Sequence, residues 1–128
     1  MAIRFKIVQR KNPRDLEAPP KYYGSVVTTG KAKTSDLAKE VAENTTLNAA
    51  ELELALRLLS QVSRRRLAEG QSVDVLDLCT LTPTVSTEGA ETEADFNMSS
   101  HLRKVTVRIR PKKELLEAVR SASLEKVK

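Results

Sequence analysis

The side chains that usually carry enzymatic chemistry are scarce in this chain. Its 128 residues contain one histidine, His101, and one cysteine, Cys79. A structural or catalytic metal site needs three or four ligands at characteristic spacing, which these two residues cannot supply. The four glycines form neither a phosphate-binding loop nor a dinucleotide-binding turn. The sequence therefore predicts a protein that is not an enzyme, carries no metal or cofactor and binds no small-molecule substrate.

Cationic side chains, in contrast, recur at regular spacing near the end of the chain. Residues 102–110 alternate in polarity, which is typical of a β-strand with one apolar and one polar face. Side chains two residues apart on a strand are separated by about 7 Å, so the polar face forms a row of cations. The row consists of Lys104, Arg108 and Arg110, with Thr106 among them.

A short helix is predicted directly after this strand. Pro111 suits its first turn, and two cations, Lys112 and Lys113, would stand exposed at its start. Cations at the N-terminus of a helix oppose its dipole, and a bound anion would relieve that conflict. The same two residues therefore extend the candidate anion-binding row.

The charges are divided into blocks along the chain. Residues 1–34 contain eight Lys/Arg and two Asp/Glu, and residues 101–128 contain nine and three, so that each end carries a net charge of +6. Residues 73–100 contain no Lys/Arg and six Asp/Glu. If the fold joins the two basic ends, they would attract a polyanion; the alternative is a solubilising surface without a partner. On the strand predicted over residues 3–10, one face carries Arg4, Lys6 and Arg10.

The segment 48–70 predicts the longest helix. Asn48 is a capping residue, Glu51 follows three positions later, and Gly70 permits the left-handed backbone that ends many helices. Apolar residues spread over far more of this helix than the stripe of about 100° that one core requires. We expect the second apolar side to contact another copy of the chain; the alternative is a monomer whose own sheet covers both sides. The predicted dimer interface consists of Leu52, Leu54, Leu56, Leu58, Leu59 and Val62.

The remaining segments predict a small main domain with additions at both ends. Strands over residues 3–10 and 22–29 form an N-terminal β extension, residues 1–33, in which Tyr22 and Tyr23 either pack or stack on bases. The main domain, residues 34–120, begins with a short helix capped by Thr34 or Ser35. Residues 121–128 are expected to fray as a C-terminal tail.

The middle of the main domain predicts a bent strand and an arm. Residues 72–86 are strand-like, but the apolar phase changes near Val75 and Leu76, which indicates a bulge or bend. Pro83 places the later part of this strand at a sheet edge or in an arm. Residues 91–100 are acidic and polar, and we expect them to be mobile or weakly paired.

Overall composition limits where such a protein works. The length fits one domain, and no apolar run is long enough to cross a membrane. A single cysteine excludes an internal disulfide framework and fits a reducing compartment. We therefore expect a cytoplasmic protein.

Three segments, together with the order of the elements, resemble the HU/IHF family of bacterial histone-like DNA-binding proteins. The segments are SDLAKEVA at residues 35–42, EGQSVDV at residues 69–75 and KELLEAV at residues 113–119. The chain resembles a divergent subgroup with an N-terminal extension. The resemblance implies an α+β fold: an intertwined homodimer with a helical base, an antiparallel β-sheet saddle and an arm from each copy.

The resemblance also implies a function: architectural, nucleoid-associated binding of double-stranded DNA with low sequence specificity. The arm departs from the family because it has no Lys/Arg between Gly70 and His101 and has four acids from Glu88 to Asp95. The predicted DNA contacts therefore lie elsewhere, at Lys104, Arg108, Arg110, Lys112 and Lys113, with Arg4, Lys6 and Arg10. The alternative is an HU-fold protein-interaction or structural module that has lost DNA binding.

Overall fold

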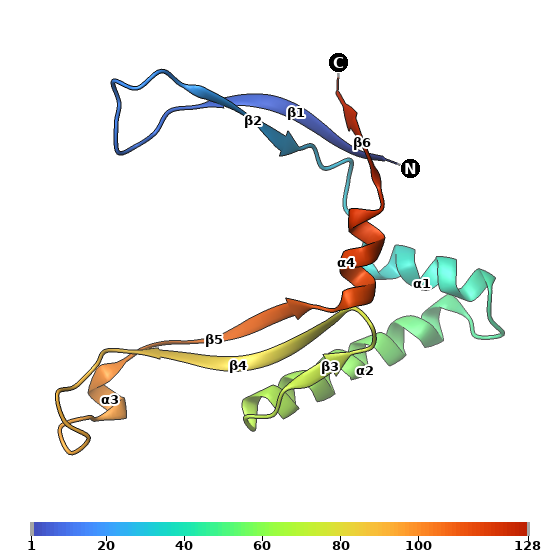
Figure 1. The fold of residues 1–128 in the computed structure, drawn as a ribbon. Coiled ribbons are helices and arrows are strands. Elements are labelled where there is room, and N and C mark those ends of the chain that lie inside the picture. The colour runs from blue at the N-terminus through green and yellow to red at the C-terminus, as the bar shows by residue number, and fades with distance from the viewer. Residues whose placement is uncertain (1, 128) are drawn as a thin grey trace.

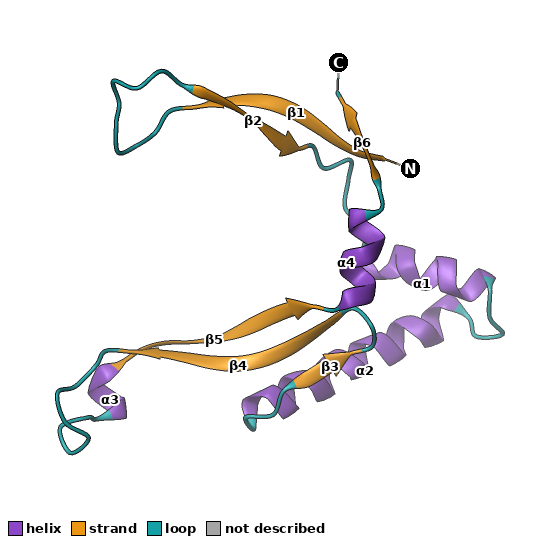
Figure 2. Cartoon of the chain, viewed as in Figure 1, coloured by secondary structure: helices purple, strands orange, loops and turns teal. Residues whose placement is uncertain are grey.

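The computed structural model describes residues 2–127 and contains two separate three-stranded sheets (Figure 1). The mixed α+β class predicted from the sequence is confirmed. In chain order the elements are β1 (Ala2–Arg10), β2 (Lys21–Val26), α1 (Thr34–Glu43), α2 (Ala49–Ala68), β3 (Val73–Val75), β4 (Cys79–Thr87), α3 (Met98–His101), β5 (Leu102–Pro111), α4 (Lys113–Arg120) and β6 (Ser123–Lys126). The first sheet has the strand order β2-β1-β6 and the second β3-β4-β5. Figure 2 shows that helices lie between the two sheets and beneath the second sheet.

The helices α1 and α2 pack against each other, and their ends follow local capping chemistry. The Asn48 Oδ1 accepts a hydrogen bond from the Glu51 backbone N–H at 2.8 Å, and Gly70 has a φ of +90°, as the sequence predicted for α2. The N-cap of helix α1 is Lys33 rather than the expected Thr34 or Ser35, and the Lys33 backbone N–H donates to Asp36 Oδ2 at 3.0 Å. Within residues 2–127 Ala38, 1% exposed, is the only buried hydrophobic residue.

The predicted bend near Val75 and Leu76 is a complete reversal of the chain. Strands β3 and β4 form an antiparallel hairpin in which Val75 pairs with Cys79. The Leu78 N–H donates to the Val75 carbonyl at 3.0 Å, and Leu76 has a φ of +51°. A leucine with positive φ is strained, so other contacts must hold this turn in place.

Beyond β3, strands β4 and β5 continue as a two-stranded ribbon (Figure 1). The last residue of β4 paired with β3 is Leu81, so Pro83 has the β5 residue Val107 on one side and no strand of its own sheet on the other. Proline is tolerated at such an edge because it lacks a backbone N–H. The prediction of an edge position for Pro83 is confirmed.

The tip of the ribbon, between β4 and β5, is shaped by local contacts. The short helix α3 follows the acidic segment, and the Phe96 and His101 rings stack with centroids 5.1 Å apart. The Asn97 N–H donates to His101 Nδ1 at 3.0 Å. The acidic segment is therefore followed by a compact turn of helix rather than by further strand.

The first sheet joins the two ends of the chain. Strand β1 lies between β2, which runs antiparallel to it, and β6, which runs parallel to it. The expectation that residues 121–128 fray is wrong for Ser123–Lys126, because these residues pair with Ala2–Phe5. The helix α4 connects this sheet to the ribbon (Figure 1). Among residues 2–127 no helix has the length and hydropathy needed to span a bilayer.

Candidate nucleic-acid interface

The ribbon has two chemically different faces, because residues paired across antiparallel strands lie on the same side of a sheet. One face is apolar and pairs Leu81 with Ile109, Pro83 with Val107, and Val85 with Val105. This apolar face is directed towards α2, since Pro83, Val105 and Val107 line one cavity together with Leu67 and Ala68 of α2.

The opposite face of the ribbon is cationic and lies away from α2. Its cations are Lys104, Arg108 and Arg110, all exposed, as the strand alternation predicted. Opposite them on β4 lie Ser86, Thr82 and Thr80 in turn, and Thr84 faces Thr106. We refer to these eight residues as the cationic face. They combine guanidinium and ammonium groups with hydroxyl groups, the donors that most often contact phosphate oxygens.

The sequence reasoning missed the hydroxyl side of this face. Hydroxyl residues occupy positions 80, 82, 84 and 86, a strict alternation that is visible in the sequence. Three of these hydroxyls already have a partner within the chain: Thr80 Oγ1 donates to Asp74 Oδ1 at 2.8 Å, Thr84 Oγ1 donates to the Thr106 carbonyl at 3.4 Å, and Thr82 Oγ1 lies 3.2 Å from Ser72 Oγ. Because a hydroxyl has a single O–H, Thr80 and Thr84 must release these bonds before they can donate to a phosphate.

The cations of this face are not neutralised by the acidic arm. The ion pairs within 4.0 Å among residues 2–127 involve other cations, and the arm residue Glu88 pairs instead with Arg103 at 3.7 Å. Arg103 is the extra residue of a bulge, because Thr87 pairs with Leu102 while Ser86 pairs with Lys104. The positive charge of Lys104, Arg108 and Arg110 therefore faces solvent without a carboxylate partner.

Lys112 differs from the expectation of an exposed cation. Its side chain is 29% exposed; its Nζ donates to the Leu76 carbonyl at 2.6 Å and lies 3.5 Å from Asp74 Oδ1. Its backbone N–H also donates to the Leu78 carbonyl at 2.8 Å. Lys112 thus fixes the strained β3–β4 turn against the start of α4, and these contacts reduce the charge that it can offer to a ligand.

Asp74 is an acidic residue on the side of the sheet that bears the cationic face. A hydrogen bond from Thr80 Oγ1 at 2.8 Å, together with the positive charge of Lys112, lowers the pKa of the Asp74 carboxyl below its usual range. The carboxylate is therefore ionised at neutral pH and compensates Lys112 at the inner end of the ribbon.

The other candidate cations lie in different environments. Lys113 is highly exposed at the start of α4, and its Nζ lies 3.7 Å from Oε1 of Glu117, one turn later in the helix. Arg4, Lys6 and Arg10 are on β1, in the first sheet. There Arg4 lies opposite Glu125 of β6 in the strand register, and Arg10 lies opposite Lys21 of β2. The structure therefore groups Lys104, Arg108 and Arg110 on one sheet and places Arg4, Lys6 and Arg10 on another.

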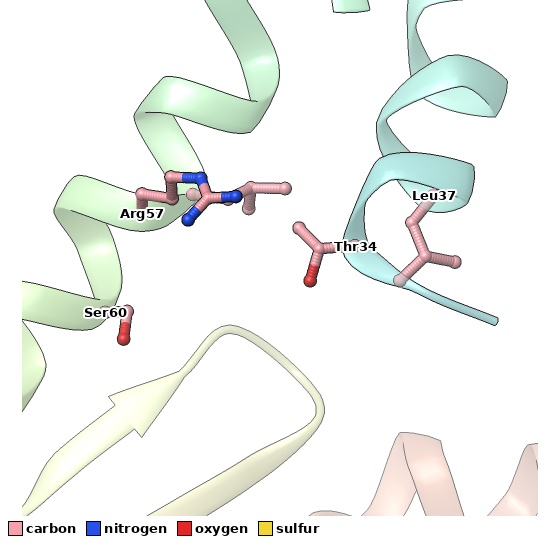
Figure 3. Close-up of a pocket in the computed structure, with 5 residues that line it drawn as sticks. Thr34, Leu37, Arg57 and Ser60 are labelled. Atoms are coloured by element: carbon pink, nitrogen blue, oxygen red, sulfur yellow. The ribbon is translucent and has the colours of Figure 1, made fainter. Parts of the chain in front are cut away.

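The apolar side of the structure remains largely uncovered in the single chain. All the predicted interface residues except Leu52 are exposed, with Leu54 at 59%. An open hollow of about 360 Å³ lies between the helices, where Arg57 of α2 reaches towards Thr34 at the start of α1 (Figure 3). The chain's own sheet therefore does not cover both sides of α2.

Comparison with solved structures identifies a similar fold. A crystal structure described provisionally as a bacterial DNA-binding protein from Bacteroides vulgatus ATCC 8482 has 17% sequence identity and a TM-score of 0.65. The match covers 98% of this chain and 48% of that one, so the chain spans about half the length of its structural relative. No functionally curated protein matches the chain significantly.

A family model extends this comparison to the sequence. It describes an HU domain fused to a wHTH, Ig or glycine-rich motif and matches residues 1–126. The resemblance to HU-type proteins inferred from the sequence is confirmed, and the β1–β2 extension and β6 fall inside the matched region. The chain belongs to the HU-HIG family.

Proposed function

We propose that this chain is a dimeric, non-enzymatic DNA-binding protein that holds the phosphate backbone of a duplex on the cationic face of β4 and β5. The observation that carries the proposal is the unneutralised row of Lys104, Arg108 and Arg110 opposite a row of hydroxyls. The membership in an HU-type family and the described role of the structural neighbour support DNA as the polyanion.

The contacts that this face offers suit phosphate rather than bases. Phosphate contacts fix the position of a protein on DNA but carry no direct sequence information. The face combines three cations with short hydroxyl side chains, all of which suit phosphate, so we expect low sequence specificity and a role in organising a bacterial nucleoid. Lys113 and, from the first sheet, Arg4, Lys6 and Arg10 would add electrostatic attraction.

The dimer in this proposal follows from the uncovered apolar surface. Burying a leucine side chain fully is worth about 1.5–3 kcal/mol, and the chain leaves Leu54, Leu58 and Leu59 about half exposed. A single buried alanine is too small a core for a stable domain. A second copy that covers α2 and the apolar face of the ribbon would complete the core and bring two cationic faces into one assembly.

A salt series tests the proposal directly. Contacts to about four to six phosphates predict that log affinity falls with log salt concentration with a slope of about −4 to −5. The double variant Arg108→Glu with Arg110→Glu removes four cations from the proposed dimer, so it should weaken binding at least about tenfold and make the slope shallower by about 3 to 4. The matched control, Lys31→Glu with Lys39→Glu, makes the same charge change on exposed residues outside both sheets and should have a much smaller effect.

A second candidate function rests on the acidic arm. Glu91, Glu93 and Asp95 are exposed near the tip of the ribbon and would be repelled by DNA. In this alternative the HU-type fold has become a protein-interaction module, and the arm contacts a basic partner. Wild-type protein without measurable DNA affinity at about 50 mM salt would favour this alternative, because phosphate contacts are strongest at low salt.

A further inference from the structure

A second charged surface lies at the far end of the first sheet, where β1 turns back into β2. An open hollow of about 390 Å³ is located there, within the size range of small-ligand sites. Its lining combines cations with rigid apolar surfaces and includes Arg10, Lys11, Pro13, Pro19, Lys21 and Tyr23. It belongs to a different sheet from the cationic face, and Arg10 is its only residue to which the proposed duplex binding assigns a part.

The cations of this hollow repel one another. Arg10 and Lys21 are directly paired across the two strands, and like charges in such a pair destabilise a sheet. Among residues 2–127, the carboxylates that form ion pairs do so with other cations, and Arg10, Lys11 and Lys21 have none within 4.0 Å. An anion bound between them would remove this repulsion.

An aromatic ring lies beside these cations. Tyr23 is 47% exposed and shares a strand face with Arg10, whose guanidinium carbon is 5.9 Å from the ring centroid. Tyr22, on the opposite face, is 69% exposed. The sequence left open whether these tyrosines pack or stack on bases, and neither ring is packed into a core. An exposed ring beside three cations can contact a ligand that combines a flat aromatic group with separate negatively charged groups.

We propose that this hollow binds a single-stranded segment of nucleic acid, with its phosphates on Arg10, Lys11 and Lys21 and a base stacked on Tyr23. Single strands offer both a flexible phosphate backbone and open base faces, and sites for them combine cationic grooves with aromatic rings. A duplex exposes only the edges of its bases, which an aromatic ring cannot stack on. The proposal is therefore independent of duplex binding by the cationic face.

The tyrosines themselves provide the assay. The chain has two tyrosines and no tryptophan, so intrinsic fluorescence reports on β2 alone. The full chain is used with Arg108→Glu and Arg110→Glu, which should weaken duplex binding at the other sheet, and with Tyr22→Phe, which leaves Tyr23 as the only tyrosine. We expect an oligothymidylate of about eight nucleotides to quench this fluorescence saturably at low salt, after correction for absorption by the bases.

Two changes then test the site. Adding Lys11→Gln and Lys21→Gln should weaken the interaction at least about tenfold, because two phosphate contacts are lost without introducing new repulsion. Replacing Tyr22→Phe by Tyr23→Phe leaves Tyr22, outside the hollow, as the reporter and should abolish most of the quenching. Circular dichroism of each variant is the control for retention of the fold.

Three results would overturn the proposal. These are the absence of saturable quenching, equal quenching by a duplex of the same length, and unchanged affinity in the Lys11→Gln, Lys21→Gln variant. Failure of duplex binding by the wild-type protein would leave the proposal intact, because the oligothymidylate titration is made with Arg108 and Arg110 of the cationic face already replaced.

Discussion

The two sheets of this protein use the same sequence pattern in different surroundings. Each contains a long strand, β1 or β5, with cations at alternate positions. On β5 the alternate cations Lys104, Arg108 and Arg110 face neutral hydroxyls and have no carboxylate of the described residues within 4.0 Å, whereas on β1 Arg4 is the strand partner of Glu125 and Arg10 that of Lys21. A row of cations along a strand therefore does not define a binding surface by itself; the residues paired with it determine what it can bind.

The two sheets also differ in how they are supported. The apolar face of the second sheet lies over α2, and Lys112 fixes its turn against α4. The first sheet depends on the short strand β6 for its third member, and it is joined to the helices through residues 27–33 and through α4. This difference can be tested by perturbing each support separately.

The largest effect is expected at α2. Leu58→Asp places a charge on the proposed dimer interface and should dissociate the dimer and unfold the chain, because the single chain lacks a core. Light scattering and thermal unfolding provide the measurement. The control is Leu16→Asp, the same substitution on the exposed β1–β2 connection. It should change neither the molecular mass from light scattering nor the unfolding temperature. A stable folded Leu58→Asp monomer would contradict the proposed interface.

An intermediate effect is expected from removing β6. A chain ending at residue 120 loses the parallel pairing with Ala2–Phe5 and the hydrogen bond from Val127 N–H to the Phe5 carbonyl at 2.9 Å. Amide hydrogen exchange in β1 should become at least about tenfold faster, since local opening controls exchange. Exchange in β5 should not change, and it provides the internal control. Equal acceleration in both strands would show that the two sheets are not independent.

The sequence predicted local features more accurately than distant pairings. The cap at Asn48, the end of α2 at Gly70 and the alternation of β5 depend on neighbouring residues and were found. The pairing of β6 with β1 joins residues about 120 positions apart, and four residues carry too little periodicity to reveal it. The Lys112 contacts were missed for the same reason, since Asp74 and Leu76 are distant in the chain.

The candidate site divides in the same way. The face of Lys104, Arg108 and Arg110 followed from strand period alone. Which β4 residues oppose it depends on the hairpin register, which only the fold supplies. The hydroxyl alternation at Thr80, Thr82 and Thr84 was readable, but without the register it could not be assigned to the same face.

The smallest effect is expected at Asp74, whose ion pair with Lys112 joins the second sheet to the start of α4. Its pKa is lowered from the usual value of 3.8 by the Thr80 hydrogen bond and by Lys112. A carboxyl with a lowered folded-state pKa stabilises the folded turn above its unfolded pKa and loses that contribution as pH falls through the folded pKa. Acidification below the usual value should therefore loosen the turn at Leu76 while the fold persists.

The test is an NMR titration of the Leu76 and Leu78 amides from about pH 6 to about pH 2. The titration is made in an Asp77→Asn background, because the Asp77 carboxyl lies between the two reporter amides and would perturb them independently of Asp74. In this background the amides should shift as Asp74 is protonated, and adding Asp74→Asn should abolish the shift. Asp74→Asn also removes a negative charge on the side of the sheet that bears the cationic face, so duplex affinity at neutral pH should rise slightly. A loss of affinity would mean that the Asp74–Lys112 contact also positions the cationic face.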